Sequence, residues 1–435
     1  MKNTTETSQW LIIHKLAFRF FFIYFVLQVQ SWSWFFSWIP GVDFLLGYLN
    51  QGMDWLVKIA NEYIFHVREI LVPMGGSGDT SYGWAQLWLF LSLALFGGII
   101  WTILDSKRKN YVVLDFWLRT VIRYYIILVL LTYGLSKVFI QQMGFPLISQ
   151  LATPLGDLLP MRFSWLFIGY SDSYQIFSGV MEVLPALLML YRRTLNLGIF
   201  IAFAVFLNVM MINLCYDVPV KIFSIQMTFS CFYLLANNLM HFFNFFVLNK
   251  PTVLDTSYHY KYVSKTMRWG RIAFKTIFII FALIMPVYET WSGFSSEEAE
   301  SKPIKSGVYE VKTFVVNRDS TAKSIPDSLK WKDMIFEKGT SQMGSINTMD
   351  TLFRKRYNRA YFNYEVDTLT HIMYVRKRQN DNSFIFSMRY EIPDSNTVKF
   401  WAKIRKDSIY VVIKKSKRHF QLAERQFHWL SEDNR

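Results

Sequence analysis

Residues 84–104 read WAQLWLFLSLALFGGIIWTIL and contain no charged side chain. A helix of about 20 predominantly apolar residues is long enough to cross the hydrocarbon core of a bilayer. The whole chain of 435 residues is 52% hydrophobic and 18% aromatic but only 18% charged, whereas soluble domains carry roughly 25% charged residues. This composition favours an integral membrane protein and excludes a disordered, collagen-like or disulfide-stapled chain.

Six further apolar runs bring the number of predicted membrane spans to seven. The seven runs are 16–38, 84–104, 116–140, 174–191, 197–215, 221–240 and 272–291. No small-residue cleavage site follows the first run, so we expect it to be retained as a helix. The short run 164–170 is expected to dip into the membrane edge or to extend the fourth helix. We therefore predict an α-helical polytopic bundle of about seven spans over residues 1–293.

Basic residues cluster in alternate segments between the predicted spans. They are Lys107, Arg108 and Lys109 after the second span, Arg192 and Arg193 after the fourth, and Lys250, Lys261, Lys265, Arg268 and Arg271 after the sixth. Lys and Arg mark cytoplasmic loops, and Lys2, Lys15 and Arg19 assign the N-terminus to the same side. An odd number of spans then places the C-terminal part outside the cytoplasm. We predict a bacterial inner (cytoplasmic) membrane protein in this orientation.

The segment 51–72, between the first two spans, has an amphipathic pattern. Apolar residues recur at roughly helical spacing from Trp55 to Leu71, and Asp54, Lys58 and Glu62 share another face. We expect a helix that either lies at the outer membrane interface or packs on the bundle. A Gly-rich turn follows, and Asp79 or Thr80 is a suitable N-cap for the second span.

Beyond residue 293 the pattern changes to that of a β-domain. Residues 294–306 are polar and predict a linker. Strands are then predicted at 308–317, 332–337, 359–366, 370–377, 384–392, 398–404 and 408–414. Short strands separated by turns are typical of an antiparallel β-sandwich or a lipocalin-like barrel, which we assign to 307–435. We favour a packed or partner-binding module over a barrel that holds an apolar ligand.

Charge and cysteine content add several exclusions. The net charge of +15 divides into +7 for residues 1–293 and +8 for the remainder. We interpret the basic excess outside the membrane as a solvated mixed surface, with no nucleic acid as partner. Two cysteines without metal spacing predict neither a disulfide framework nor a metal site. No predicted span holds two histidines, and phosphate-loop, nucleophile-elbow and zinc-protease motifs are missing from the sequence.

Five polar residues in or beside the spans form a candidate site. The catalytic residues are predicted to be Glu182, which lies mid-span in the fourth run, Asp217 and Lys221, with Lys137 and Asn213 as support. Ionisable groups inside a membrane are costly and therefore indicate function by default. Glu182 is predicted to relay protons, or else to be buried neutral or paired with Lys137. Asp217 and Lys221, which flank Pro219, form either part of this site or a structural ion pair in a helical hairpin.

Three stretches resemble the DoxX-like membrane family: Gly179-Val-Met-Glu182, the basic turn Arg192-Arg193, and the segment from Asn208 to Lys221. The resemblance covers roughly 118–240 and implies a four-helix core. Large members from Bacteroidota similarly add helices before that core and a β-rich domain after it. The chain is also remotely similar to vitamin-K-carboxylase-like (HTTM) bundles.

The resemblance implies a redox-associated membrane component that takes a quinone or a reduced sulfur species at its outward-facing polar site. The residues themselves name no cofactor, and they leave open whether the chain is an enzyme. The alternative is a membrane anchor or assembly subunit whose β-domain binds a protein partner. A lipid or small-molecule transporter is a third class, but the sequence lacks a broken-helix repeat.

Overall fold

The computed structural model describes residues 9–30, 43–73, 78–253, 264–294, 303–317, 330–338, 342–351, 353–357, 359–377 and 384–425. The chain divides into two compact units. One comprises residues 1–143 and 171–292, and the other comprises 144–170 and 293–435. The predicted linker 294–306 lies mostly outside the described residues, as do 31–38 of the first predicted span.

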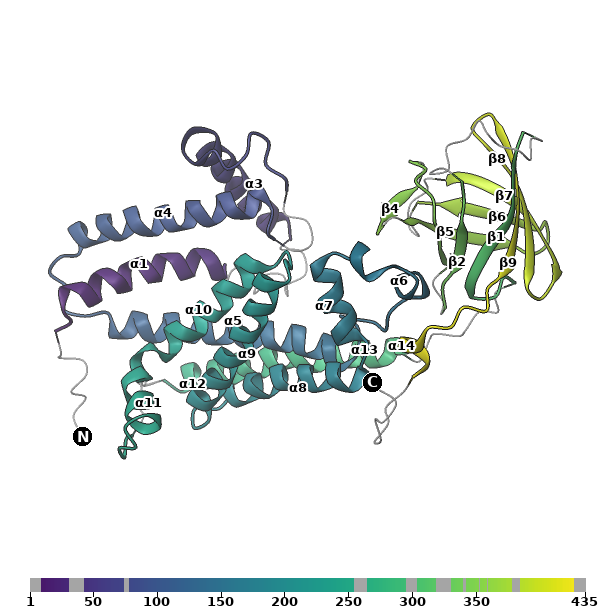
Figure 1. Cartoon of the computed structure of the whole chain (residues 1–435). Coiled ribbons are helices and arrows are strands. Elements are labelled where there is room, and N and C mark those ends of the chain that lie inside the picture. Colours follow the sequence, from purple (N-terminus) through teal and green to yellow (C-terminus); the bar gives the residue numbers. More distant parts are fainter. Residues whose placement is uncertain are drawn as a thin grey trace. The chain divides into compact units, whose positions relative to one another are not determined.

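The first unit is helical (Figure 1). Its helices are α1 (Ile12–Val29), α3 (Asp43–Ala60), α4 (Ser81–Leu104), α5 (Val112–Val138), α8 (Asp172–Met189), α9 (Leu195–Cys215), α10 (Lys221–Leu235), α11 (Leu239–Phe246), α12 (Lys265–Ile279) and α13 (Met285–Phe294). Among the described residues, four helices are long and apolar enough to cross a membrane: Ile12–Val29, Ser81–Leu104, Leu195–Cys215 and Lys265–Ser292. The other three predicted spans are helical, as α5, α8 and α10 with α11, and the count of seven stays a prediction.

Helix α5 lies at the centre of this unit. Its residues Ile122, Ile126, Ile127 and Leu130 are fully buried in one core cluster with side chains of α1, α8, α9, α10 and α12. Their spacing of three and four residues is that of a helix face. Burying such branched side chains supplies the packing that holds the neighbouring helices against α5.

Contacts near the start of α5 join several helix ends. The Trp10 amide, just before α1, donates to the Lys109 carbonyl after α4 at 3.0 Å. Arg119 reaches the last carbonyls of α10, and Arg123 reaches the last carbonyl of α8. The starts of α1 and α5 and the ends of α4, α8 and α10 therefore lie at one end of the unit.

Helices α5 and α8 approach closely at two glycines. A Cβ atom added to Gly179 would lie 2.6 Å from the Gly134 carbonyl oxygen and 2.7 Å from the Val138 nitrogen. Small residues let helix backbones approach closely inside a membrane. The pair Gly134 and Gly179 therefore sets the distance between the two helices.

We expect Gly179→Ala to destabilise the helical unit by about 1–3 kcal/mol, because the added methyl meets backbone that cannot move aside cheaply. Thermal unfolding of the purified protein in detergent measures the change. Gly270→Ala in α12 is the matched control, since nothing lies within 4 Å of its added Cβ and alanine is the better helix former. Equal melting temperatures for the wild type and Gly179→Ala would contradict the close approach.

The predicted amphipathic helix exists but is displaced. Helix α3 begins at Asp43 and continues as a π-helical turn over Asn61–Phe65, so the prediction 51–72 was wrong at both ends. The Asn61 side chain terminates it, since its amide donates to the Arg68 carbonyl and its oxygen accepts from the Val67 amide.

Both interpretations of this helix receive support from its burial pattern. Val57 and Ala60 are buried against Tyr82, Ala85 and Leu89, so one face packs on α4. Trp55 and Tyr63 remain 62% and 71% exposed, so the other face is apolar and free for a membrane interface. Thr80 is the N-cap of α4, as predicted, and its hydroxyl accepts from the Gly83 amide.

The second unit contains an antiparallel barrel. Its strands are β1 (Gly307–Val316), β2 (Asp333–Phe336), β3 (Met343–Ile346), β4 (Arg354–Arg356), β5 (Arg359–Asp367), β6 (Ile372–Arg376), β7 (Phe384–Asp394), β8 (Thr397–Ile404) and β9 (Asp407–Lys415). In the described part of the chain, eight of them close a ring in the order β1-β2-β3-β5-β6-β7-β8-β9, and β4 pairs only with β5. Of the two predicted architectures, the barrel is therefore confirmed.

The barrel interior is filled with side chains. Tyr309, Phe336, Phe362, Phe400 and Ile413 are each at most 1% exposed and belong to one cluster. The strand β3, which sequence analysis missed, contains Gly344, and an added Cβ there would lie 2.5 Å from the Phe362 ring. This packing agrees with a solid module rather than with a barrel that encloses a large ligand.

The segment 144–170 belongs to the barrel unit. It contains α6 (Ile148–Leu151), a 3₁₀ turn (Leu155–Asp157) and α7 (Pro160–Gly169). The buried carboxylate of Glu337 accepts the Ile148 and Ser149 amides at 2.8 and 3.0 Å. The expectation that 164–170 extends the fourth helix was wrong, because α7 ends before Ser171, whose hydroxyl caps α8.

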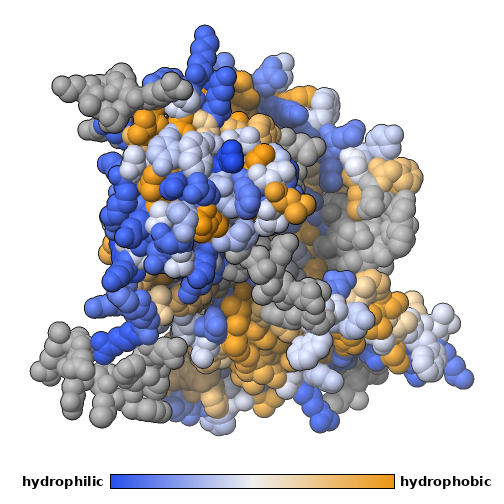
Figure 2. Space-filling view, turned by 90° about the vertical axis from the view of Figure 1, so that its right-hand side faces the viewer, coloured by the Kyte–Doolittle hydropathy of each residue, from blue (hydrophilic) through white to orange (hydrophobic). Residues whose placement is uncertain are grey.

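The last described segment of the chain contains the short helix α14 (Gln421–Glu424), and 426–435 lie outside the described residues. Most of the exposed large apolar side chains belong to the first unit. Figure 2 shows apolar patches, in orange, on one face of the molecule. A lipid environment would cover such a surface.

Candidate functional site

A buried ion pair lies in the contact between α5 and α8. The Lys137 ammonium donates to Oε1 of Glu182 at 2.5 Å, and the two residues are 7% and 5% exposed. The approach at Gly134 and Gly179 brings these side chains together from the two helices. The amino-acid sequence alone leaves this pairing open, and the structure contains it.

Buried polar atoms on the same face of α8 lack hydrogen-bond partners. Within the described part of the chain, Oε2 of Glu182 and both polar atoms of the Gln175 side chain are buried without a hydrogen bond. Gln175 is fully buried and lies two helical turns before Glu182, on the same face of α8. Buried polar groups are costly when unpaired, so each of these side chains is suited to a hydrogen bond with water or a small polar ligand.

Gln175 was missed by the sequence analysis. It lies near the start of the fourth predicted span, where an amide side chain is expected to face the membrane interface. The signal that could have found it is its spacing of seven residues from Glu182, which places both on one helix face.

The second predicted pair lies at the turn between α9 and α10. Lys221 Nζ is 2.7 Å from Asp217 Oδ1, and the Asp217 side chain is 78% exposed. The Asp79 carboxylate, which sequence analysis considered only as a cap for α4, accepts the Lys221 and Ile222 amides at 2.7 and 3.0 Å. Carboxylates stabilise helix N-termini, so these contacts fix the start of α10.

The five predicted site residues therefore form two pairs and one separate residue. Asn213 is 5% exposed on α9, and its carbonyl accepts from the Val218 amide. No hydrogen bond or ion pair among the described residues joins the Lys137–Glu182 pair to the Asp217–Lys221 pair. Only the first pair combines burial, charge and unpartnered polar atoms.

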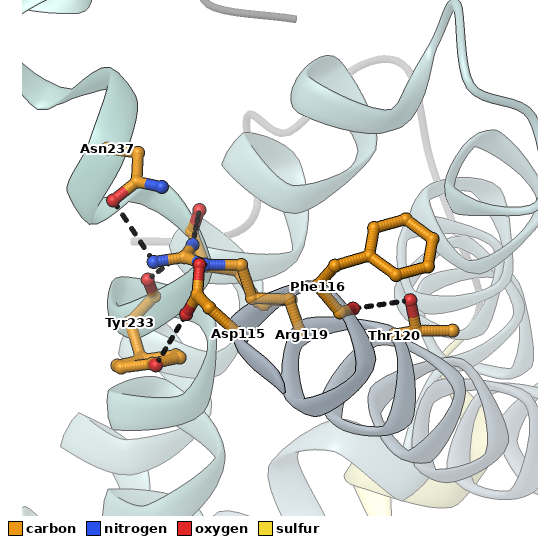
Figure 3. A network of polar contacts seen from close by, with 7 residues as sticks. Asp115, Phe116, Arg119, Thr120, Tyr233 and Asn237 are labelled. Carbon is orange, nitrogen blue, oxygen red and sulfur yellow. Dashed lines mark hydrogen bonds and ion pairs between the residues drawn. The ribbon is translucent and has the colours of Figure 1, made fainter. Parts of the chain in front are cut away.

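Two further polar networks were not predicted. Arg119 pairs with Asp115, and the Arg119 guanidinium donates to the carbonyls of Tyr233 and Leu234 and to Asn237 (Figure 3). These contacts satisfy the C-terminal carbonyls of α10.

The second network surrounds Arg19, which is only 2% exposed. Arg19 donates to the Tyr111 and Thr102 hydroxyls and to the Asp105 carbonyl, and the neighbouring Lys15 donates to the Arg108 carbonyl. Lys15 and Arg19 are among the basic residues from which the cytoplasmic side of the N-terminus is predicted. In the structure they also connect α1 to the segment between α4 and α5. In the described residues, no cluster of His, Cys, Asp and Glu could hold a metal ion.

Sequence comparison identifies a relative. The uncharacterized protein YwoB of Bacillus subtilis (strain 168) is 34% identical over 114 residues, which cover 72% of that protein and 26% of this chain. This chain belongs to the YwoB family. The name of the YwoB relative states no activity, so membership of the YwoB family assigns none. No family model and no solved structure matches the chain.

We expect the effects of Lys137 and Glu182 on the stability of the protein to be coupled. Lys137→Met leaves the Glu182 carboxylate buried and unpaired, which costs about 3–5 kcal/mol. The double variant Lys137→Met/Glu182→Met removes both charges and should recover most of that loss. Thermal unfolding in detergent of the two single variants and the double variant measures the coupling. Additive losses would mean that the side chains do not pair.

Proposed function

We propose that this chain is a DoxX-like integral membrane component that holds a small redox-active ligand, a quinone or a reduced sulfur species, beside the Lys137–Glu182 pair. Glu182 is its proton relay, and Lys137 balances the carboxylate charge. The observation that carries the proposal is the group of buried, unpartnered polar atoms on Glu182 and Gln175. The Asp217–Lys221 pair and Asn213 support the helices at a distance.

The chemistry of the pair suits such a ligand. The free Oε2 of Glu182 can accept a proton or a hydrogen bond, and the Gln175 amide offers both a donor and an acceptor. Quinone oxygens accept hydrogen bonds when oxidised and carry protons when reduced. A positioned carboxyl group with its charge balanced by an ammonium can hand over those protons.

The first experiment is an ultraviolet–visible spectrum and a mass spectrum of everything bound to the protein purified in mild detergent. We expect a stoichiometric quinone or other small chromophore. Glu182→Gln keeps the shape of the side chain but removes its charge, so bound ligand should fall roughly tenfold, which corresponds to the loss of one charge-assisted contact. Asp217→Asn, at the exposed pair, is the matched control and should retain the ligand.

The result separates this proposal from its alternative. A clean spectrum together with a copurifying protein would overturn the redox proposal and favour an anchor or assembly subunit. The filled interior of the barrel supports that alternative, because a packed module serves recognition by its surface. Deleting 294–435 should then remove the copurifying protein, and Glu182→Gln should leave it bound.

We further propose seven spans in a bacterial inner membrane, with the N-terminus in the cytoplasm and the barrel outside it. The contacts of Trp10 with Lys109, of Arg119 with the end of α10, and of Lys275 with Leu190 support this arrangement. They bring alternate helix ends, with their basic segments, to one end of the unit, as the positive-inside rule requires.

This topology predicts that protease added outside spheroplasts removes the barrel. We expect an antibody against residues 384–425 to lose its signal, while a tag at the N-terminus stays protected until the membrane is opened. Protection of the barrel in intact spheroplasts would overturn the orientation. A cytoplasmic marker protein followed in the same sample controls for lysis.

A further inference from the structure

A cavity of about 830 Å³ lies in the helical unit, away from the Lys137–Glu182 pair. It is formed by the first turns of α5, the turn between α8 and α9, and α12 along most of its length, from Met267 to Ile279. Its cationic lining residues are Arg123, Arg192, Arg271 and Lys275. No acidic side chain is among the described residues that line it.

The four cations act on one another. The Arg192 charge repels Arg123, and the charges of Arg123 and Arg271 repel Lys275. Like charges gathered at one cavity destabilise the protein unless an anion joins them. Their concentration here is therefore a reason to expect a negatively charged occupant.

Backbone carbonyls at the end of α8 hold two of these cations in place. Arg123 Nε donates to the Met189 carbonyl at 2.7 Å, and Lys275 Nζ donates to the Leu190 carbonyl at 2.9 Å. The two Nη groups of Arg123 make no hydrogen bond to the described part of the chain. A guanidinium fixed by Nε with its outer edge unused is suited to bidentate contact with a phosphate.

The remaining walls of the cavity are apolar and aromatic. Phe116, Trp117, Tyr124, Ile272 and Phe274 line it. Phe116 and Thr120 lie on the side of α5 away from the Arg119 network (Figure 3), so the cavity does not share that network. Cationic groups beside an apolar wall match a molecule with an anionic head and a hydrocarbon tail.

We propose that this cavity binds the phosphate head group of an anionic amphiphile, with Arg123, Arg192, Arg271 and Lys275 around the phosphate and the aromatic wall along the apolar part. Basic pockets between membrane helices recognise lipid head groups in this manner. The site is separate from the proposed redox site and does not depend on it.

The test uses the full chain purified in a neutral detergent, with native mass spectrometry of added phosphatidylglycerol, phosphatidylcholine of the same acyl chains, and glycerol 3-phosphate. We expect one phosphatidylglycerol molecule to be retained in preference to phosphatidylcholine. The double variant Arg192→Gln/Arg271→Gln changes two exposed cavity residues. It should weaken that binding roughly thirtyfold, since each basic residue contributes about fivefold.

The matched control is Arg193→Gln/Arg268→Gln, which removes two charges next to the cavity from residues that do not line it. This control should bind phosphatidylglycerol within about twofold of the wild type. Phosphatidylglycerol should also raise the melting temperature of the wild type but not that of Arg192→Gln/Arg271→Gln.

Four outcomes decide the proposal. Equal retention of the two lipids, or equal loss in both double variants, would overturn it. Binding of phosphatidylglycerol without competition from glycerol 3-phosphate would support a lipid. Binding of glycerol 3-phosphate at comparable strength would overturn the amphiphile and assign the phosphate site to a soluble phosphorylated compound.

Discussion

The helical unit depends on how closely α5 and α8 approach at Gly134 and Gly179. In a bilayer, helices gain little from burying apolar surface against each other, so backbone proximity and polar contacts hold them together. Here the glycine contact provides the backbone proximity. It also aligns Lys137 with Glu182, each of which lies one helical turn after its glycine, and so provides the polar contact. A larger residue at either glycine would separate the helices and leave two charges without partners.

Helix α5 serves different purposes on its different faces. Near its start, Arg119 satisfies the end of α10, while Phe116 and Thr120 line the basic cavity. Near its end, Lys137 meets Glu182. Both proposed sites are therefore positioned by one buried helix at its opposite ends.

Sequence patterns predicted seven of the nine strands in the described part of the chain, and the alternation of buried and exposed residues is clearest in β5, β6 and β7. The three-residue β4 was not predicted. The patterns also missed β3, since Gly344 breaks the alternation and is required only by the distant Phe362 ring. They identified Glu182 and Lys137 because charge inside an apolar run is conspicuous. The burial of Gln175 and the contacts of Asp79 with the start of α10 were not predicted, because they arise from tertiary packing.

Closure of the barrel has a consequence for biosynthesis. The first strand pairs with the last, from Tyr309 with Lys415 to Val316 with Ile409, so the ring cannot form until β9 has been translated. Pairings this distant in sequence fold slowly. The contact of Ile148 with Glu337 bridges 189 residues. The segment that contains Ile148 therefore cannot make this contact until Glu337 has been synthesised. The barrel therefore closes only after β9 has been made, and a ribosome stalled before β9 would leave an open sheet exposed to aggregation.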